Sequence, residues 1–265
     1  MEKIKAKKEF GQNFLKDSSI LDKIIQSMPH NNNHIVEIGP GLGDLTKNLV
    51  KYKDVTAYEV DTDLIGILKS KFASEIESKK FTLKHIDVLR AWDELKFLHD
   101  GKYDLIANLP YYIATNIILR AFEDELCEHI IVMVQKEVAQ KFTAKVNDKE
   151  YSSLGIMTEL ISKESKILFD VPPTAFDPMP KVTSSVLYIK KDLSLKLDKD
   201  FNRFLKACFV QPRKKLSKNL GSLLEKSKIL ALYEELDLND NLRPHEVSSS
   251  LYSQMHTRVI NGRDK

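Results

Sequence analysis

The chain has 265 residues, 42% of them hydrophobic, and a formal net charge of +3, which predicts one large domain with a sizeable core and a smaller second domain. A membrane or secreted protein is disfavoured and a cytoplasmic one expected, because no run is apolar enough to cross a bilayer and the basic segment Met1–Lys8 lacks the apolar stretch of a signal peptide. Cys127 and Cys208 are too few and too far apart for a disulfide framework, and no metal site is expected because no nearby His or Cys gives metal-ligand spacing.

A buried strand leads into a glycine-rich turn early in the chain. The apolar run Ile35–Ile38 is followed by Gly39, Gly41 and Gly43, which lets the backbone approach a ligand closely. A dinucleotide fingerprint would place its last glycine at position 44, where Asp44 stands, and no Gly-Lys-Ser/Thr follows. The turn therefore favours neither a nicotinamide dinucleotide nor a Walker loop.

The next two predicted strands each end in an acidic residue. Val55–Tyr58 is followed by Glu59, which lies 20 residues after Gly39, the separation at which a carboxylate meets a ribose diol. Phe81–Ile86 is followed by Asp87, which is placed to accept a hydrogen bond from an adenine amino group and fits a helix N-cap equally well. Asp61 is expected to open the next helix rather than to bind ribose.

A fourth strand, Tyr103–Ala107, ends in Asn108-Leu109-Pro110-Tyr111. The side-chain oxygen of Asn108 and the carbonyl of Leu109 or Pro110 could accept hydrogen bonds from the amino group of a nucleobase, and Tyr111 could stack the base. Alone, Asn-x-Pro is also an ordinary turn after a strand. Four strand ends in series nevertheless indicate a nucleoside cofactor across the carboxyl edge of a parallel sheet.

The alternation of strand and helix patterns up to about residue 190 predicts a doubly wound α/β sheet. Later strands are expected at His129–Gln135, Ser165–Val171 and Ser184–Lys190, with an antiparallel edge, and helices at Ile20–Met28, Leu45–Tyr52, Leu64–Phe72 and Asn116–Phe122. Beyond Leu193, strand patterns cease and apolar residues recur at helical spacing, among them Phe201, Phe204 and Leu205, then Leu230, Leu232 and Tyr233. The sequence thus predicts a domain over residues 1–191 and a small helical domain over residues 192–265, with a linker at Asp192–Asp200.

Basic residues are concentrated in the last third of the chain. Residues 177–265 hold 17 Lys or Arg against 11 Asp or Glu. Within them four cations occur without an intervening acid, and an N-terminal arm with four lysines could add a second contact to nucleic acid. A solvated helix face and a disordered terminus are the alternatives. The cations are Arg213, Lys214, Lys215 and Lys218, and the lysines of the arm are Lys3, Lys5, Lys7 and Lys8.

Four segments in this order resemble the rRNA adenine N6,N6-dimethyltransferase family, and within it the bacterial small-subunit branch. They read FGQNFL at Phe10–Leu15, VEIGPGLGDLT at Val36–Thr46, NLPY at Asn108–Tyr111 and FDPMPKVTS at Phe176–Ser184. The resemblance covers essentially the whole chain and implies a Rossmann-like class I methyltransferase fold with a small C-terminal all-helical domain for RNA binding. Two departures stand out: Tyr112, where the commonest form reads NLPYN, and Pro212, where the basic cluster of the family usually has an arginine. Pro212 could soften RNA contact or start a helix at its first position.

The resemblance also implies roles for single residues, with S-adenosylmethionine as the cofactor. Asn13 and Leu15 match positions that close over it, Gly39 matches the turn beside its methionine portion, Glu59 matches the ribose carboxylate and Asp87 the adenine contact. Gly41 is a further expected cofactor-binding residue. Asn108 matches both a cofactor contact and the catalytic amide, with Leu109 and Pro110 beside it. Phe176 is expected to face the target adenine from the side opposite Tyr111. Arg213, Lys214, Lys215 and Lys218 are the expected RNA contacts.

The implied function is N6,N6-dimethylation of two adjacent adenines in a loop near the 3′ end of small-subunit (16S) rRNA, during ribosome biogenesis. The implied partner is that rRNA in an immature 30S particle, with the protein acting as a monomer. Three alternatives stay open: the antibiotic-resistance branch, which acts on large-subunit (23S) rRNA, an assembly factor whose binding matters more than its catalysis, and an N6-adenine DNA methyltransferase. The last would need target-recognition elements and base flipping, for which the short helical tail offers no obvious candidate.

Overall fold

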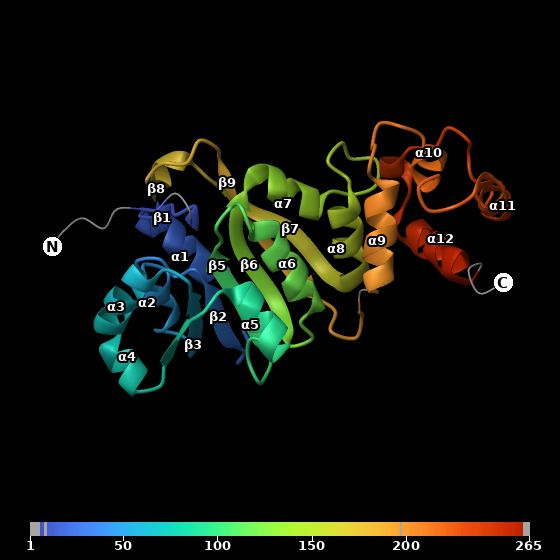
Figure 1. The fold of residues 1–265 in the computed structure, drawn as a ribbon. Helices are drawn as coiled ribbons and strands as arrows, with labels where there is room; N and C mark the ends of the chain where they lie inside the picture. The colour runs from blue at the N-terminus through green and yellow to red at the C-terminus, as the bar shows by residue number, and fades with distance from the viewer. Residues whose placement is uncertain (1–5, 8–9, 197, 262–265) are drawn as a thin grey trace. The chain divides into compact units, whose positions relative to one another are not determined.

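The computed structural model describes residues 6–7, 10–196 and 198–261 (Figure 1). The chain divides into two compact units, one of residues 1–139 with 163–193 and the other of residues 140–162 with 194–265. Residues 140–162 thus group with the later helices, although they precede the last strands of the sheet. The predicted domains, residues 1–191 and 192–265, differ from these units chiefly in that segment.

The first unit is built on a seven-stranded sheet in the order β4-β3-β2-β5-β6-β9-β7. From β4 to β6 all neighbours are parallel, and β9 runs antiparallel to β6 (Figure 1). This order confirms the predicted doubly wound, mostly parallel sheet with an antiparallel edge. The strands are β2 (His34–Ile38), β3 (Val55–Glu59), β4 (Phe81–His85), β5 (Tyr103–Asn108), β6 (Cys127–Gln135), β7 (Ser162–Val171) and β9 (Ser184–Lys191).

The chain order of the sheet reverses between β2 and β5. From β2 the chain proceeds outward to β3 and β4, and it then returns to place β5 on the other side of β2. Ligands of doubly wound sheets bind at such a switch point, beyond the carboxyl ends of the strands. A small second sheet pairs β1 (Phe14–Leu15) antiparallel to β8 (Phe176–Asp177). No pattern in the sequence predicted this pairing.

Helices follow most of the strands, and three of them begin at an aspartate. Asp17, Asp61 and Asp87 each accept a hydrogen bond from a backbone N–H two residues later, which satisfies one of the unpaired donors of the first turn. The predicted helix start at Asp61 is confirmed. The helical segments are α1 (Ser18–Gln26), α2 (Thr46–Leu49), α3 (Thr62–Lys71), α4 (Ala73–Glu77), α5 (Val88–Leu95), α6 (Ala114–Glu123), α7 (Lys136–Thr143) and the 3-10 helix η2 (Pro173–Ala175).

The second unit is helical, as predicted for the last part of the chain. Phe201, Phe204 and Leu205 are at most 5% exposed and form part of its core, whereas Leu230, which belongs to the same apolar pattern, is 58% exposed. Within the described residues, no helix of either unit combines the length and the apolar character that a membrane span needs. The helical segments are α8 (Ser153–Ile161), α9 (Lys199–Cys208), α10 (Leu216–Leu220), α11 (Lys226–Glu235), η3 (Pro244–Glu246) and α12 (Ser249–Asn261).

Candidate active site

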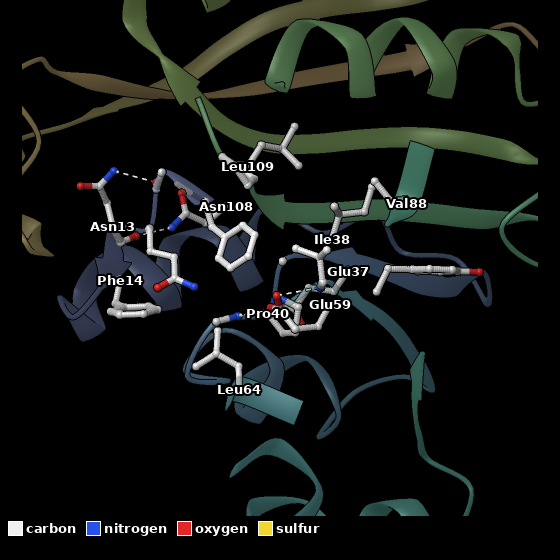
Figure 2. A pocket seen from close by; sticks show the side chains of 18 of the residues that line it. Asn13, Phe14, Glu37, Ile38, Pro40, Glu59, Leu64, Val88, Asn108 and Leu109 are labelled. Atoms are coloured by element: carbon white, nitrogen blue, oxygen red, sulfur yellow. Dashed lines mark hydrogen bonds between the residues drawn. The ribbon is translucent and has the colours of Figure 1, made fainter. Parts of the chain in front are cut away.

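A cavity of about 1010 Å³, part of it open to solvent, lies at the carboxyl ends of β2, β3 and β5 (Figure 2). Every residue predicted to bind the cofactor lines it, and so do four of the five predicted catalytic residues. The structure thus brings together segments that lie up to about a hundred residues apart in the chain. The predicted residues along the wall are Asn13, Leu15, Gly39, Gly41, Glu59, Asp87, Asn108, Leu109, Pro110 and Tyr111.

The glycine-rich turn forms one wall of the cavity and is packed too closely for side chains. Gly41 and Gly43 have positive φ angles of +59° and +76°, which other residues rarely adopt. A Cβ atom at Gly41 would lie 3.1 Å from the ring of Phe14, and one at Gly43 would lie 2.5 Å from the ring of Phe72. The turn therefore needs glycine both for its backbone and for the approach of its neighbours.

Glu59 ends β3 and is held rigidly by backbone amides. Its Oε1 atom accepts hydrogen bonds from the N–H groups of Val60 and Asp61, each at 2.9 Å, while Oε2 receives a longer one, 3.4 Å, from Gly41. Burial raises the pKa of Glu59, and these amide hydrogen bonds oppose the rise. The carboxylate is thus fixed in orientation at the cavity wall, with capacity left on Oε2 to accept from a ligand hydroxyl.

Glu37 is a second buried carboxyl in the wall, and it was not among the residues predicted to form the site. It is 2% exposed and accepts a hydrogen bond of 2.6 Å from the hydroxyl of Thr46. Burial raises the pKa of Glu37 to about 8, against the opposing effect of the Thr46 hydrogen bond, so the carboxyl is mainly neutral at pH 7. The available signal was an acidic residue inside an otherwise apolar strand, immediately before the glycine turn.

Asp87 serves as the N-cap of α5 and also lines the cavity. Its Oδ1 atom accepts from the backbone N–H of Leu89 at 2.8 Å and of Arg90 at 3.5 Å. The N-cap alternative is thus confirmed, and both cap hydrogen bonds go to one of the two carboxylate oxygens. The predicted contact with adenine stays a prediction, for which the second oxygen offers an acceptor.

Asn108 is the last residue of β5, and a hydrogen bond to the N-terminal segment orients its side-chain amide. Its Nδ2 atom donates a hydrogen bond of 3.0 Å to the backbone carbonyl of Asn13 (Figure 2), and the next residue, Leu109, donates its N–H to the carbonyl of Met133 at 3.1 Å. The first bond fixes the orientation of the amide plane. The Oδ1 atom is left as an acceptor for a second partner in the cavity.

The two aromatic residues predicted to enclose a base differ in their surroundings. Tyr111 lines the cavity and is half-buried, and its hydroxyl bonds to Ser184. Phe176 is 5% exposed, pairs with Leu15 through β1 and β8, and packs in the core rather than along the cavity wall. Its predicted position against the target adenine stays a prediction. Tyr112, the departure from the family pattern, is 60% exposed at the rim.

The N-terminal segment forms a further wall and is tied down at both ends. Lys7 donates to Asp61 at 2.6 Å, Gln12 donates to the same carboxylate at 2.8 Å, and the backbone N–H of Lys16 donates to the carbonyl of Ala175 at 2.8 Å. Lys7 also forms an ion pair with Asp63. Its ammonium is therefore engaged by carboxylates rather than presented to RNA. The other lysines of the predicted arm, Lys3, Lys5 and Lys8, lie outside the described residues.

The predicted RNA contacts lie in the second unit, on the turn between α9 and α10 and at the start of α10. Arg213, Lys214, Lys215 and Lys218 are all exposed. Asn219, which is 5% exposed, fixes the turn by accepting from the N–H of Gln211 at 2.9 Å and donating to its carbonyl at 3.1 Å.

Pro212 lies within this turn, and α10 begins only at Leu216, so the expectation that Pro212 starts a helix is wrong.

Among the described residues of both units, no group of three or more His, Cys, Asp or Glu side chains is arranged to hold a metal ion.

Comparison with known proteins gives one consistent result. A sequence model of the family described as ribosomal RNA adenine dimethylase matches residues 3–260. The chain is 82% identical over 265 residues to the ribosomal RNA small subunit methyltransferase A of Aliarcobacter butzleri (strain RM4018), with 100% of both chains covered. It is 54% identical over 256 residues to the protein of the same name from Sulfurimonas denitrificans (strain ATCC 33889 / DSM 1251), covering 97% of this chain and 94% of that one. A dimethyladenosine transferase from Plasmodium falciparum shares the fold, with a TM-score of 0.76 and 24% identity over 91% of this chain and 95% of its own.

Proposed function

The chain belongs to the ribosomal RNA adenine dimethylase family, and from this premise we propose that it dimethylates N6 of two adjacent adenines near the 3′ end of small-subunit (16S) rRNA. The methyl donor is S-adenosylmethionine. The names of the relatives at 82% and 54% identity favour the small subunit over the large one as the source of the substrate. The observation that carries the chemistry is Asn108, whose amide nitrogen is engaged by Asn13 and whose oxygen is left to accept in the cavity.

The residues of the cavity fit a nucleoside that carries a positive charge. Gly39 and Gly41 line the cavity without side chains, so a ligand can approach the backbone of the turn closely. Glu59 offers a fixed carboxylate for a ribose diol, and Asp87 offers an acceptor for an adenine amino group. When bound, S-adenosylmethionine supplies a methyl group on a positively charged sulfur.

Asn108 and its neighbours act on the amino group of the target adenine. The lone pair of N6 is delocalised into the ring, and positive charge develops on nitrogen as it becomes a nucleophile. The Oδ1 atom of Asn108 and the carbonyl of Leu109 or Pro110 accept its hydrogens and stabilise that charge. Tyr111 stacks the base and aligns it, and the proton leaves to water afterwards. Proximity and alignment therefore supply most of the acceleration, without a general base at the start.

The proposed partner is small-subunit rRNA in an immature 30S particle in the cytoplasm. The protein binds it as a monomer. Its phosphates are contacted by the exposed cations at Arg213, Lys214, Lys215 and Lys218. Such contacts fix the position of the RNA but carry no sequence information. The choice of adenine rests instead on RNA shape and on an unpaired base that enters the cavity.

The test is transfer of labelled methyl from S-adenosylmethionine to purified, unmethylated small and large ribosomal subunits in parallel, with nucleoside mass analysis. We expect dimethyladenosine in the small subunit alone. Label in large-subunit RNA would assign the protein to the resistance branch. Tight binding to small subunits without label in either RNA would support an assembly factor instead.

A further inference from the structure

A hydrogen bond joins the two motifs that flank the proposed place of the target base. The hydroxyl of Tyr111, in the segment after β5, lies 2.5 Å from Oγ of Ser184, the first residue of β9. Ser184 is 0% exposed. Burial raises the pKa of Tyr111, against the opposing effect of Ser184, so the phenol keeps its proton at neutral pH. The bond is therefore one between two neutral hydroxyls, one of them on a fully buried side chain.

The two partners differ in how firmly the backbone holds them. Ser184 pairs with Gln135 in the antiparallel ladder of β6 and β9, and the preceding carbonyl, of Thr183, accepts from the N–H of Lys136 at 3.0 Å. Tyr111 lies in a turn between β5 and α6, outside any strand. The hydrogen bond thus links the hydroxyl of Tyr111, which lies on a turn, to Ser184, which is held in the sheet. The hydroxyl oxygen of a tyrosine lies on the axis about which its ring turns, so the bond fixes where the ring lies. Because a phenol O–H prefers the plane of its ring, the bond also favours one ring plane.

The next residue along the strand provides a natural comparison. Ser185 is also 0% exposed, and it donates a short hydrogen bond, 2.6 Å, to Oδ1 of Asp170 in β7. Because successive side chains of a strand point to opposite faces, Ser184 and Ser185 each make one side-chain bond, on opposite faces of the sheet. Only the bond of Ser184 reaches a residue that lines the cavity.

We propose that Ser184 is a positioning residue for methyl transfer, whose hydroxyl holds the Tyr111 ring in the place where it stacks the target adenine. This inference rests on the proposed function, because it concerns the same cavity. Ser184 does not itself line that cavity, so its effect passes through Tyr111 to the RNA base and leaves the cofactor untouched. The expected signature is a slower transfer step at unchanged affinity for S-adenosylmethionine.

The experiment compares S184A, Y111F, the double variant and the control S185A. Single-turnover methyl transfer to small subunits is measured at saturating enzyme, with Kd for S-adenosylmethionine from calorimetry and Tm for each protein. We expect S184A and Y111F each to slow transfer about 10-fold, as loss of one hydrogen bond of this kind implies. The double variant should be no slower than either single one, and Kd should change less than about twofold. S184T, which keeps the hydroxyl, should recover most of the rate.

The control separates positioning from packing. S185A should lower Tm as much as S184A does, while its transfer rate stays at the wild-type value. Transfer by S184A and Y111F at the wild-type rate would overturn the inference, as would effects that multiply in the double variant or an equal loss in S185A. If S184A fails to fold, Y111F still breaks the bond from the other side with Ser184 in place. A wild-type protein that methylates no RNA would instead refute the proposed function itself.

Discussion

The cavity of the first unit and the basic turn of the second hold their polar groups in opposite ways. At the cavity, Glu59, Asn108 and Tyr111 are each tied to backbone or to a buried side chain, so their atoms have fixed positions. At the turn, Arg213 and its neighbours are exposed, and only the backbone beneath them is fixed, through Asn219. The first arrangement suits chemistry that depends on alignment, and the second suits attraction to phosphates. Substitutions should therefore act sharply at the cavity and additively at the turn.

The largest effect is expected at Asn108. N108A removes both the proposed acceptor for the adenine amino group and the bond to Asn13, and it should lower kcat about 10²- to 10³-fold, the usual cost of losing one group that stabilises a developing charge. N108D keeps an acceptor but sets a carboxylate against the Asn13 carbonyl, so it should not restore the rate. Steady-state methyl transfer measures kcat, and calorimetry measures the affinity for S-adenosylmethionine. Unchanged turnover in N108A would contradict the assignment of Asn108.

A large effect on stability is expected at the glycine turn. G43A places a Cβ atom 2.5 Å from the Phe72 ring at a φ of +76°, and it should destabilise the protein by about 2–4 kcal/mol. G66A is the matched control, because Gly66 lies exposed within α3 with no atom within 4 Å of an added Cβ. It should stabilise by about 0.5–1 kcal/mol. Urea unfolding of both variants measures the difference. An unchanged free energy of unfolding in G43A would mean that the turn can shift to accept the added Cβ atom.

Glu37 should make stability depend on pH. Its folded pKa of about 8 lies above the ordinary value of 4.5, so the folded state keeps a proton that the unfolded state releases. The stability that this proton provides is complete below about pH 4.5 and is lost as the pH rises towards 8. As the pH rises over this range, E37Q should therefore become more stable relative to the wild type. The difference in free energy of unfolding should reach a few kcal/mol, at about 1.4 kcal/mol per unit of pKa shift. Tm measured from pH 5 to 9 tests this.

The exposed Glu77 provides the control for that series. E77Q should follow the wild-type curve, because Glu77 is exposed on the surface. A constant difference between E37Q and the wild type would show that Glu37 is already ionised at pH 5.

The smallest single effects are expected at the basic turn. Replacing Arg213, Lys214, Lys215 or Lys218 by alanine should each weaken RNA binding several-fold and reduce the slope of log K against log salt by about 1 for each phosphate that is no longer neutralised. The effects should add. K226A, at an exposed lysine on α11, is the control and should leave the slope unchanged. A single replacement that abolished methyl transfer without changing the salt slope would place that residue in the chemistry and break the contrast with the cavity.

The strand ends were predictable from sequence because each combines an apolar run with a polar residue that breaks it. Residues 39, 59, 87 and 108 are brought to one edge by parallel pairing, which the alternation of strands and helices along the chain already predicts. The start of α5 at Asp87 was predicted only as an alternative, because an aspartate after a strand fits a ligand contact as well as a helix start. The short α4 buries no residue and so leaves no apolar pattern to detect.

What escaped prediction depends on contacts between distant segments. The pairing of β1 with β8 joins two-residue strands that lie about 160 residues apart, too short to show any periodicity. The bond between Tyr111 and Ser184 and the burial of Glu37 likewise require the folded sheet. The grouping of residues 140–162 with the later helices has the same origin, because α8 precedes β7 in the chain yet contacts α9 and α12.

Asp61 caps α3 and, with the same carboxylate, holds Lys7 and Gln12 of the N-terminal segment. An ordinary N-cap accepts Ser, Thr, Asn or Asp almost interchangeably. Here Oδ1 of Asp61 accepts from the helix N–H and from Lys7, while Oδ2 accepts from Gln12. The hydroxyl of a serine or threonine at this position would have too few acceptor sites for these three donors and no charge to pair with Lys7. Among natural variants of this protein, position 61 should therefore remain aspartate wherever position 7 is basic, and should relax to other capping residues only where that lysine is lost.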